Sequence, residues 1–178
     1  MVKKVAVIGF SFRLPSHTNK QNYWEKLQSG LNLVTKVDSD RWDFDTFLHP
    51  NKQNPGTTYT FAAGSLGDVS QFDAQFFGIS PREAQLMDPQ QRQLLHLAWE
   101  AIEDAGIPPS SLRGENVGVY VGISSSDYSY RMADDLGVID SSSAVGNTAS
   151  IAANRLSYAL DLRGPSMSLD TACSSSLV

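Results

Sequence analysis

Apolar and polar positions follow two different spacings along the chain, and together they predict alternating strands and helices. Residues 5–8 form a short continuous apolar run that is typical of a strand buried on both faces. Residues 117–123 are rich in β-branched side chains and predict a second strand, and residues 166–169 predict a third. Because helical spacing lies between these runs, the sequence predicts an α/β domain with a largely parallel sheet.

One predicted helix begins near Asn22. The Asn22 side chain can cap it, Glu25 stands three positions later where it can reach back, and Gly30 can end it. Residues 148–160 carry a second helical pattern, which Gly164 and the following proline interrupt.

Two further helix starts place proline at the first helical position. Ser80 and Asp88 each stand before a proline, an arrangement that is typical of capped helices. The start at Asp88 opens a long helix whose apolar stripe stops at Gly106. His96 lies beside this stripe, where a lone histidine is usually structural.

Between residues 37 and 78 the regular spacing is lost, but aromatic residues recur. This segment is long for a loop, so we expect it to pack on its own aromatic side chains as an elaboration of the core. A stacking platform for nucleic acid is the alternative, and the absence of a basic lining disfavours it. The aromatic residues are Trp42, Phe44, Phe47, Tyr59, Phe61, Phe72, Phe76 and Phe77.

Composition and charge narrow the possible partners. The 178 residues are 41% hydrophobic, which suits one globular domain over residues 1–178. The net charge of -5 gives no electrostatic footprint for nucleic acid or an anionic membrane. No apolar run approaches the roughly 20 residues of a membrane span. A single cysteine excludes an internal disulfide framework, and a reducing, cytoplasmic location is the default expectation.

The single cysteine, Cys173, lies in the string D-T-A-C-S-S-S-L at residues 170–177. A buried, structural thiol is one interpretation, because free cysteine behaves as a small hydrophobe. A nucleophile is the other, since a strand that ends among small residues resembles a strand-to-helix elbow. At a helix start the dipole would favour the thiolate, and the Cys173 N–H could face a developing oxyanion. Spacing alone leaves both interpretations open.

A cysteine nucleophile usually needs a base or a cationic partner nearby. The chain offers His17, His49 and His96, and none has a local context that marks it as catalytic. Gly9 is followed by Phe10, Ser11, Phe12 and Arg13, which do not continue a G-x-G-x-x-G pattern, and this excludes a dinucleotide site there. No metal and no directly bound cofactor is predicted.

Several strings of residues, in order along the chain, carry a family resemblance. They are V-A-V-I-G-F-S-F-R-L-P at 5–15, D-R-W-D at 40–43, F-D-A-Q-F-F-G-I-S-P-R-E-A at 72–84, M-D-P-Q-Q-R at 87–92, W-E-A-I-E-D-A-G at 99–106, G-N-T-A-S-I-A-A-N-R-L-S-Y at 146–158 and R-G-P-S-M-S-L-D-T-A-C-S-S-S-L at 163–177. With them the chain resembles the N-terminal half of a β-ketoacyl synthase, the ketosynthase domain of modular type I polyketide synthases.

The resemblance implies a thiolase-like α/β fold with layered αβαβα architecture, usually in a homodimer. It implies that Cys173 accepts an acyl chain from the phosphopantetheine arm of an acyl carrier protein. A malonyl-type unit on a carrier then loses carbon dioxide and attacks the Cys173 thioester, so this acyltransferase extends polyketide or fatty acid chains. The substrates are carried on phosphopantetheine, and no cofactor binds directly.

The chain also departs from that family. The resemblance implies members more than twice as long, with two catalytic histidines in their C-terminal half. Residues 1–178 are therefore predicted to be the N-terminal part of a ketosynthase domain, truncated just after the nucleophile and inactive alone. A non-catalytic ketosynthase-like partner subunit is the alternative, and retention of Cys173 argues against it.

Overall fold

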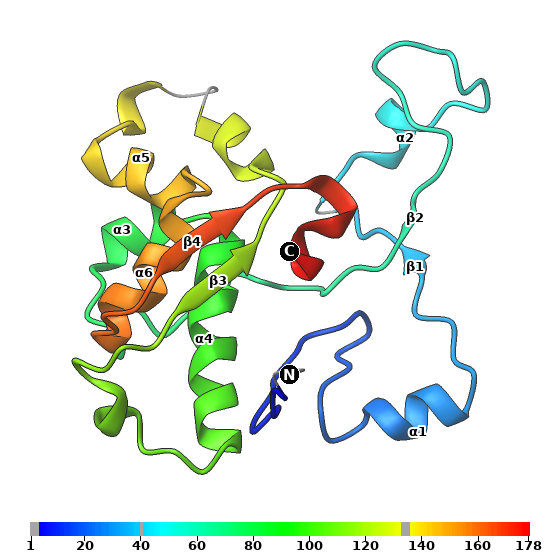
Figure 1. Ribbon diagram of the computed structural model, residues 1–178. Helices are drawn as coiled ribbons and strands as arrows, with labels where there is room; N and C mark the ends of the chain where they lie inside the picture. The colour runs from blue at the N-terminus through cyan, green and yellow to red at the C-terminus, as the bar shows by residue number, and fades with distance from the viewer. Residues whose placement is uncertain (1–3, 40, 133–135) are drawn as a thin grey trace. The chain divides into compact units, whose positions relative to one another are not determined.

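Two compact units make up the chain in the computed structural model, which describes residues 4–39, 41–132 and 136–178 (Figure 1). Unit 1 consists of Met1–Ser11 and Val69–Val178, and unit 2 consists of Phe12–Asp68. Unit 1 contains Cys173 and the strands and helices that lead to it, so the candidate site is described within this unit.

Unit 1 is built on two parallel strands, β3 (Val119–Gly122) and β4 (Ser166–Leu169). Their register pairs Val119 with Ser166 and Gly122 with Leu169. The predicted second and third strands are thus confirmed, and so is their parallel pairing. Because the strands are parallel, the residues that follow Gly122 and Leu169 leave the sheet at the same edge (Figure 1).

Helices of unit 1 pack behind the strands in successive layers. Helix α6 (Ile151–Leu160) contacts both β3 and β4, and α4 (Pro89–Asp104) contacts α6. Helices α3 (Pro81–Leu86) and α5 (Ser141–Asn147) pack on each other. The buried residues that join these elements are Met87, Leu95, Val121, Ile123, Ala152, Ala153 and Leu156. Short 3₁₀ helices cover Pro109–Leu112, Asp127–Met132, Leu136–Val138 and Ala172–Leu177.

Both proline-marked helix starts are confirmed. The Ser80 hydroxyl accepts a hydrogen bond from the Glu83 N–H at 3.1 Å, and the Asp88 carboxylate accepts one from the Gln90 N–H at 2.8 Å. Gly106, at φ +67°, follows the end of α4 in the left-handed region as expected. The predicted long helix therefore has the expected start and end.

The Glu83 carboxylate is part of a polar bridge between helices. It accepts from Arg155 Nη1 of α6 at 2.7 Å, and Arg155 Nε donates to Gln91 Oε1 of α4 at 2.8 Å. The Gln91 amide in turn donates to the carbonyls of Val145 and Thr148 at the end of α5. The Arg155 side chain is only 9% exposed, so the ion pair with Glu83 compensates a buried charge while the network joins α3, α4, α5 and α6, although Arg155 Nη2 has no hydrogen-bond partner within the described ranges.

Helix α5 has no counterpart among the predicted elements. Its residues have no apolar periodicity, and the helix is instead specified by its cap. The Asp140 carboxylate accepts from the N–H groups of Ser142 and Ser143, and the Ser143 hydroxyl accepts from the Asp140 N–H. This is a full capping box, which satisfies N–H groups that have no partner inside the helix.

The strand predicted at residues 5–8 is wrong. No strand is assigned there, and Val5, Val7 and Ile8 are 90%, 83% and 67% exposed. The chain instead runs along the C-terminal part of α4, where the Phe10 N–H donates to the Asp104 carboxylate at 3.1 Å. A strand requires a neighbour to satisfy its backbone groups, and residues 5–8 pair with no strand among the described residues.

Unit 2 contains α1 (Tyr23–Gln28), α2 (Phe44–Phe47) and an antiparallel pair, β1 (Thr35–Lys36) and β2 (Ala62–Ala63). The helix predicted after Asn22 is confirmed, but its cap is wrong: the Asn22 side chain accepts from the Asn19 N–H instead. Gly30, at φ +64°, lies in the left-handed region just beyond the helix.

The aromatic residues of the irregular segment divide between the units. In unit 2, the rings of Trp42 and Phe44 lie 5.9 and 4.8 Å from that of Phe61, which is buried. In unit 1, Phe76 packs edge-on against Trp99 of α4 with centroids 4.7 Å apart. The segment thus packs on its own aromatics only in part, because its last aromatic residues belong to the core around α4.

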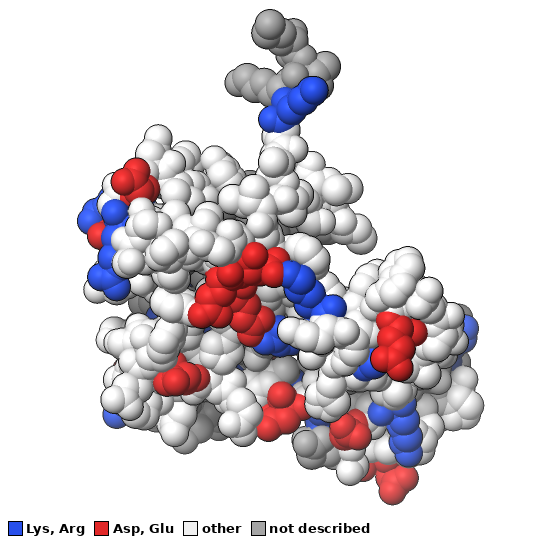
Figure 2. Space-filling view, turned by 90° about the horizontal axis from the view of Figure 1, so that it is seen from below, with Lys and Arg blue, Asp and Glu red and all other residues white. Residues whose placement is uncertain are grey.

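Figure 2 shows Lys, Arg, Asp and Glu side chains scattered over the surface, among a larger number of uncharged residues. The described part of the chain holds no helix with both the length and the apolar character that a bilayer crossing requires.

Replacing Gly146 in α5 should destabilise unit 1. A Cβ at Gly146 would lie 2.6 Å from the Leu86 carbonyl oxygen, which is backbone and cannot move aside freely. We expect Gly146→Ala to lower the free energy of unfolding by about 1–3 kcal/mol in urea titrations. Ser141→Ala, at an exposed position of the same helix, is the matched control and should change little. Equal stability of the two variants would show that α3 and α5 are not so closely packed.

The cap of α5 should give stability that depends on pH. Loss of hydration raises the pKa of Asp140, but hydrogen bonds from Arg82, Ser142 and Ser143 outweigh it and hold the pKa below its ordinary value. A lowered folded-state pKa means that the stabilisation is present at neutral pH and disappears as pH falls through the carboxyl titration.

We therefore expect Asp140→Ala to lower the melting temperature near pH 7, with the difference from wild type shrinking below about pH 4. Asp140→Asn is the control, since its amide oxygen still accepts but does not titrate. At neutral pH its melting temperature should lie between those of wild type and Asp140→Ala, because the amide keeps the cap but loses the ion pair with Arg82, and its difference from Asp140→Ala should not change with pH. A constant difference between wild type and Asp140→Ala at all pH values would argue against the charged cap.

Candidate active site

Cys173 lies just beyond β4, as the second residue of the 3₁₀ helix Ala172–Leu177. Its thiol is exposed among residues 4–178, so it does not fill a place in the core that these residues form. The predicted passage from strand to helix at this point is confirmed, although the helix is a short 3₁₀ helix. The catalytic role of Cys173 remains a prediction from the sequence.

The turn into this helix depends on an unusual backbone conformation at Ala172. Its φ is +53°, in the left-handed region, where a Cβ costs roughly 1–2 kcal/mol relative to the right-handed one. The reversal lets the chain leave β4 and start a helix within a few residues, with Cys173 on the outside. Left-handed alanine persists only where neighbouring groups hold it.

Side chains on both sides of Ala172 hold the turn. The Asp170 carboxylate accepts from the Ala172 N–H at 3.0 Å. The Ser175 hydroxyl accepts from the Thr171 N–H at 2.9 Å and donates to the Ala172 carbonyl at 2.7 Å. The Ser174 hydroxyl donates to the Thr171 carbonyl at 2.9 Å. The small polar residues around Cys173 therefore form the turn, a role that the sequence pattern only suggested.

Ser175 also fixes the turn to the neighbouring strand. A Cβ built on Gly122, the last residue of β3, would lie 3.1 Å from the Ser175 Cβ. Within residues 171–178, Ser175 is the one that is half-buried, whereas the others are exposed. Gly122 thus gives Ser175 room to pack over the end of β3, and a side chain at position 122 would crowd it.

Helix α6 holds the strand that leads to the turn. The Ser168 hydroxyl of β4 accepts from the Ala153 N–H at 3.2 Å and lies 3.4 Å from the Ser150 carbonyl, to which it donates. Ser150 precedes α6 but makes no cap with its own side chain, so Ser168 satisfies the helix start instead. Two residues back, the hydroxyls of Ser157 and Ser166 are hydrogen-bonded at 2.8 Å.

Sequence reasoning missed this contribution of Ser166 and Ser168. The alternation S-M-S in a strand places both hydroxyls on one face, and Ala153 and Ser157 share a helix face at a spacing of four. These two spacings were the signal in the sequence that the strand and the helix contact each other through serine hydroxyls.

The three histidines lie far from Cys173 in sequence. His96 packs against the rings of Phe72 and Phe77, with centroids 5.3 and 5.8 Å away, which confirms its structural interpretation. His17 and His49 belong to unit 2, where His49 Nδ1 accepts from the Asn51 N–H at 3.1 Å. In the described ranges, no group of three or more His, Cys, Asp and Glu residues could hold a metal ion.

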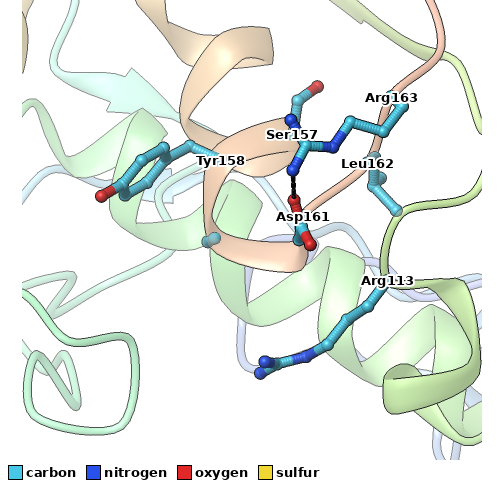
Figure 3. Close-up of a pocket in the computed structure, with 7 residues that line it drawn as sticks. Arg113, Ser157, Tyr158, Asp161, Leu162 and Arg163 are labelled. Atoms are coloured by element: carbon cyan, nitrogen blue, oxygen red, sulfur yellow. Dashed lines mark ion pairs between the residues drawn. The ribbon is translucent and has the colours of Figure 1, made fainter.

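An open hollow of about 470 Å³ lies at the end of α6 (Figure 3). Arg113, Tyr158 and Leu162 contribute to its lining, and Arg163 pairs with Asp161 at 2.6 Å within it. These residues precede β4, whereas Cys173 follows it, so the strand separates the hollow from the thiol. The hollow is therefore not the surroundings of the candidate nucleophile.

Comparison with known families gives the same result as the motifs. The family described as β-ketoacyl synthase, N-terminal domain, matches residues 2–178. The chain therefore belongs to the β-ketoacyl synthase family, and the family predicted from the ordered motifs is confirmed.

Curated relatives come from polyketide synthases. The chain is 46% identical over 179 aligned residues to a phenolphthiocerol/phthiocerol polyketide synthase of Mycobacterium tuberculosis (strain CDC 1551 / Oshkosh), covering 100% of this chain and 12% of that protein. It is 44% identical to erythronolide synthase EryA2 of Saccharopolyspora erythraea over 98% of this chain and 5% of that protein. The chain thus spans only a small part of the relatives that it matches.

Solved structures confirm the fold. The oxazolomycin ketosynthase domain from Streptomyces albus matches with a TM-score of 0.86 and 35% identity, over 98% of this chain and 31% of that chain. The ketosynthase from module 6 of the bacillaene synthase from Bacillus subtilis 168 matches with a TM-score of 0.79 and 39% identity, over 97% and 27%. The predicted thiolase-like α/β fold is thereby confirmed for the part that this chain contains.

Replacing alanine by glycine should have opposite effects on stability in the left-handed turn and in a helix. Ala172→Gly relieves the left-handed strain, and we expect it to keep or raise the melting temperature, because the penalty removed is roughly 1–2 kcal/mol. Ala159→Gly, in α6, is the matched control and should lower stability by about 1 kcal/mol. Thermal unfolding of both variants measures the contrast. A loss at position 172 equal to that at 159 would contradict the left-handed turn.

Proposed function

We propose that this chain is the acyl-accepting part of a polyketide synthase ketosynthase, with Cys173 as the residue that carries the growing chain. The observation that supports this most is the exposed thiol on a strained strand-to-helix turn, in a chain that belongs to the β-ketoacyl synthase family. A sharp strand-to-helix turn holds a nucleophile clear of the strand and the helix that it joins.

In the first step, the Cys173 thiolate attacks the carbonyl of a thioester on a carrier protein. A bond forms between Cys173 Sγ and the acyl carbon, the bond to the carrier sulfur breaks, and the carrier thiol takes up the proton that Cys173 released. A thiolate suits this exchange because it is both a good nucleophile and a good leaving group.

In the second step, a malonyl-type unit on a carrier loses carbon dioxide. The resulting carbanion attacks the Cys173 thioester carbonyl, and the new carbon–carbon bond releases the Cys173 thiolate. The product is a β-ketoacyl chain two carbons longer on the carrier. Catalytic histidines for this step are expected in the remainder of the ketosynthase domain, which this chain does not include.

The partners follow from that chemistry. An acyl carrier protein delivers both substrates on phosphopantetheine, so the chain itself needs no bound cofactor. The proposal includes a homodimeric ketosynthase in the reducing cytoplasm, which would keep the Cys173 thiol free. Polyketide assembly is favoured over fatty acid synthesis because the relatives with 46% and 44% identity are polyketide synthases.

Cys173→Ala in the full-length protein should abolish acyl loading. Incubation with a carrier-bound or N-acetylcysteamine acyl thioester, followed by intact-protein mass spectrometry, measures the adduct. Ser176→Ala, an exposed neighbour, is the control and should load like wild type. Undiminished loading of the Cys173→Ala protein would overturn the proposed function.

A further inference from the structure

The D-P-Q-Q-R string at residues 88–92 binds segments that lie far from it in the chain. Gln91 donates to carbonyls at the end of α5. Gln90 Nε2 donates to the Ser125 carbonyl at 2.9 Å, across 35 residues of sequence. This second bond joins the start of α4 to the segment that follows β3, and it takes no part in the packing of the helices.

Residues 123–126 form the loop after β3, the β3 loop, which begins beside the turn that carries Cys173. The Ile123 N–H donates to the Leu169 carbonyl at 3.1 Å, so the loop leaves the sheet directly after the last paired residues of the two strands. The turn packs against Gly122, which immediately precedes the loop. Ligands of parallel sheets bind at the carboxyl ends of the strands, so we expect an acyl chain on Cys173 to lie against the β3 loop.

Gln90 is itself held in place at the start of α4. Its backbone N–H donates to Asp88 Oδ1 at 2.8 Å, and its side-chain Nε2 donates to Asp88 Oδ2 at 3.2 Å. Asp88 is buried, so it anchors the amide to the core of unit 1. A side chain that is already ordered loses little further entropy when it binds the Ser125 carbonyl. The bond therefore fixes the distance between the β3 loop and α4.

Tyr128 anchors the chain just after the β3 loop. Its hydroxyl donates to the Gln85 carbonyl of α3 at 2.7 Å. The guanidinium groups of Arg92 and Arg131 lie 5.9 and 5.7 Å from the centre of its ring, where cation–π attraction adds to the hydrogen bond. The β3 loop is thus attached to the sheet at its start, to Gln90 in its middle and to α3 through Tyr128 at its end.

The side chains of the β3 loop contribute little to its conformation. Residues 124–126 are three serines, and all three are exposed. Exposed polar residues bury little apolar surface, so a loop of this kind is ordered chiefly by its hydrogen bonds. Loss of the Gln90 amide would remove the bond that fixes the middle of the loop to α4.

We propose that Gln90 is a positioning residue, which holds the β3 loop as the wall against which the acyl chain on Cys173 packs. This inference rests on the proposed function. The acyl carbon is bonded to Cys173 Sγ, and the carbons that follow extend away from the turn along the edge of the sheet. A wall at a fixed distance discriminates between chains of different length, whereas a mobile wall adapts to all of them. Gln90 thereby acts on the choice of acyl chain and not on the chemistry of the thiol.

Acyl discrimination measures the wall directly. In the full-length protein, the second-order rate constant for acylation of Cys173 is measured with acetyl, butyryl, hexanoyl and octanoyl N-acetylcysteamine thioesters. Gln90→Met keeps the length of the side chain but has no N–H to donate. It should lower the ratio between the best and the worst thioester by about tenfold, since a single methylene against a fixed wall contributes discrimination of that order.

Alkylation by iodoacetamide separates this role from general damage to the site. The reagent forms a bond to Cys173 Sγ and releases iodide, and it carries no chain that reaches the β3 loop. The alkylation rate of Gln90→Met should therefore stay within about twofold of wild type. Gln93→Met is the matched control, because Gln93 lies in the same helix and has no hydrogen bond to the β3 loop in the described part of the chain. Its ratio between thioesters should equal that of wild type.

Tyr128→Phe is an independent test at the other end of the loop. It keeps the ring but removes the bond to the Gln85 carbonyl, and it should also lower the ratio between the best and the worst thioester. If Gln90→Met does not fold, the result for Tyr128→Phe decides the question alone.

Three results would refute the positioning role while leaving the proposed function intact. They are a wild-type protein that accepts all four thioesters equally, an unchanged ratio in the variants, and an equal fall of acylation by every thioester and of alkylation, which shows a displaced thiol. If Cys173→Ala still loads the acyl group, the proposed function itself fails.

Discussion

The parallel pairing of β3 with β4 is the constraint on which the rest of unit 1 depends. Its register places Gly122 beside Leu169, so the end of one strand supports the turn that follows the other. Ser175 packs over Gly122 and holds the left-handed Ala172, which in turn presents Cys173. A shift of the pairing by one residue would remove this support, because successive side chains point to opposite faces of a sheet.

Helices contribute to the same geometry through polar contacts as well as apolar packing. Ser168 caps the start of α6, so the strand that leads to Cys173 is fixed to the helix behind it. That helix is fixed further by Arg155, which joins it to Gln91 and Glu83. A path of directional hydrogen bonds thus runs from the helical layer to the turn, and directional bonds specify position more narrowly than apolar contact does.

Short sequence patterns predicted the helices and strands that are specified by residues close together in the chain. Proline and cap residues located the starts of α3 and α4, and β-branched runs located β3. Residues 5–8 show the limit, since an apolar run specifies a strand only where a neighbouring strand is present. Helix α5 was missed because its residues have no apolar periodicity, and its start depends on the capping box of Asp140 and Ser143.

The candidate site likewise has a part that the local sequence predicts and a part that it does not. Cys173 was identifiable from its small neighbours and the ordered motifs, but the half-buried position of Ser175 depends on Gly122, more than 50 residues earlier in the chain.

Mapping the acyl adduct by tandem mass spectrometry tests the account most directly. After incubation of the full-length protein with an acyl thioester and cleavage after Arg163, the added mass should lie on Cys173 in the peptide that begins at Gly164. An adduct on any other residue, or none, would contradict the account.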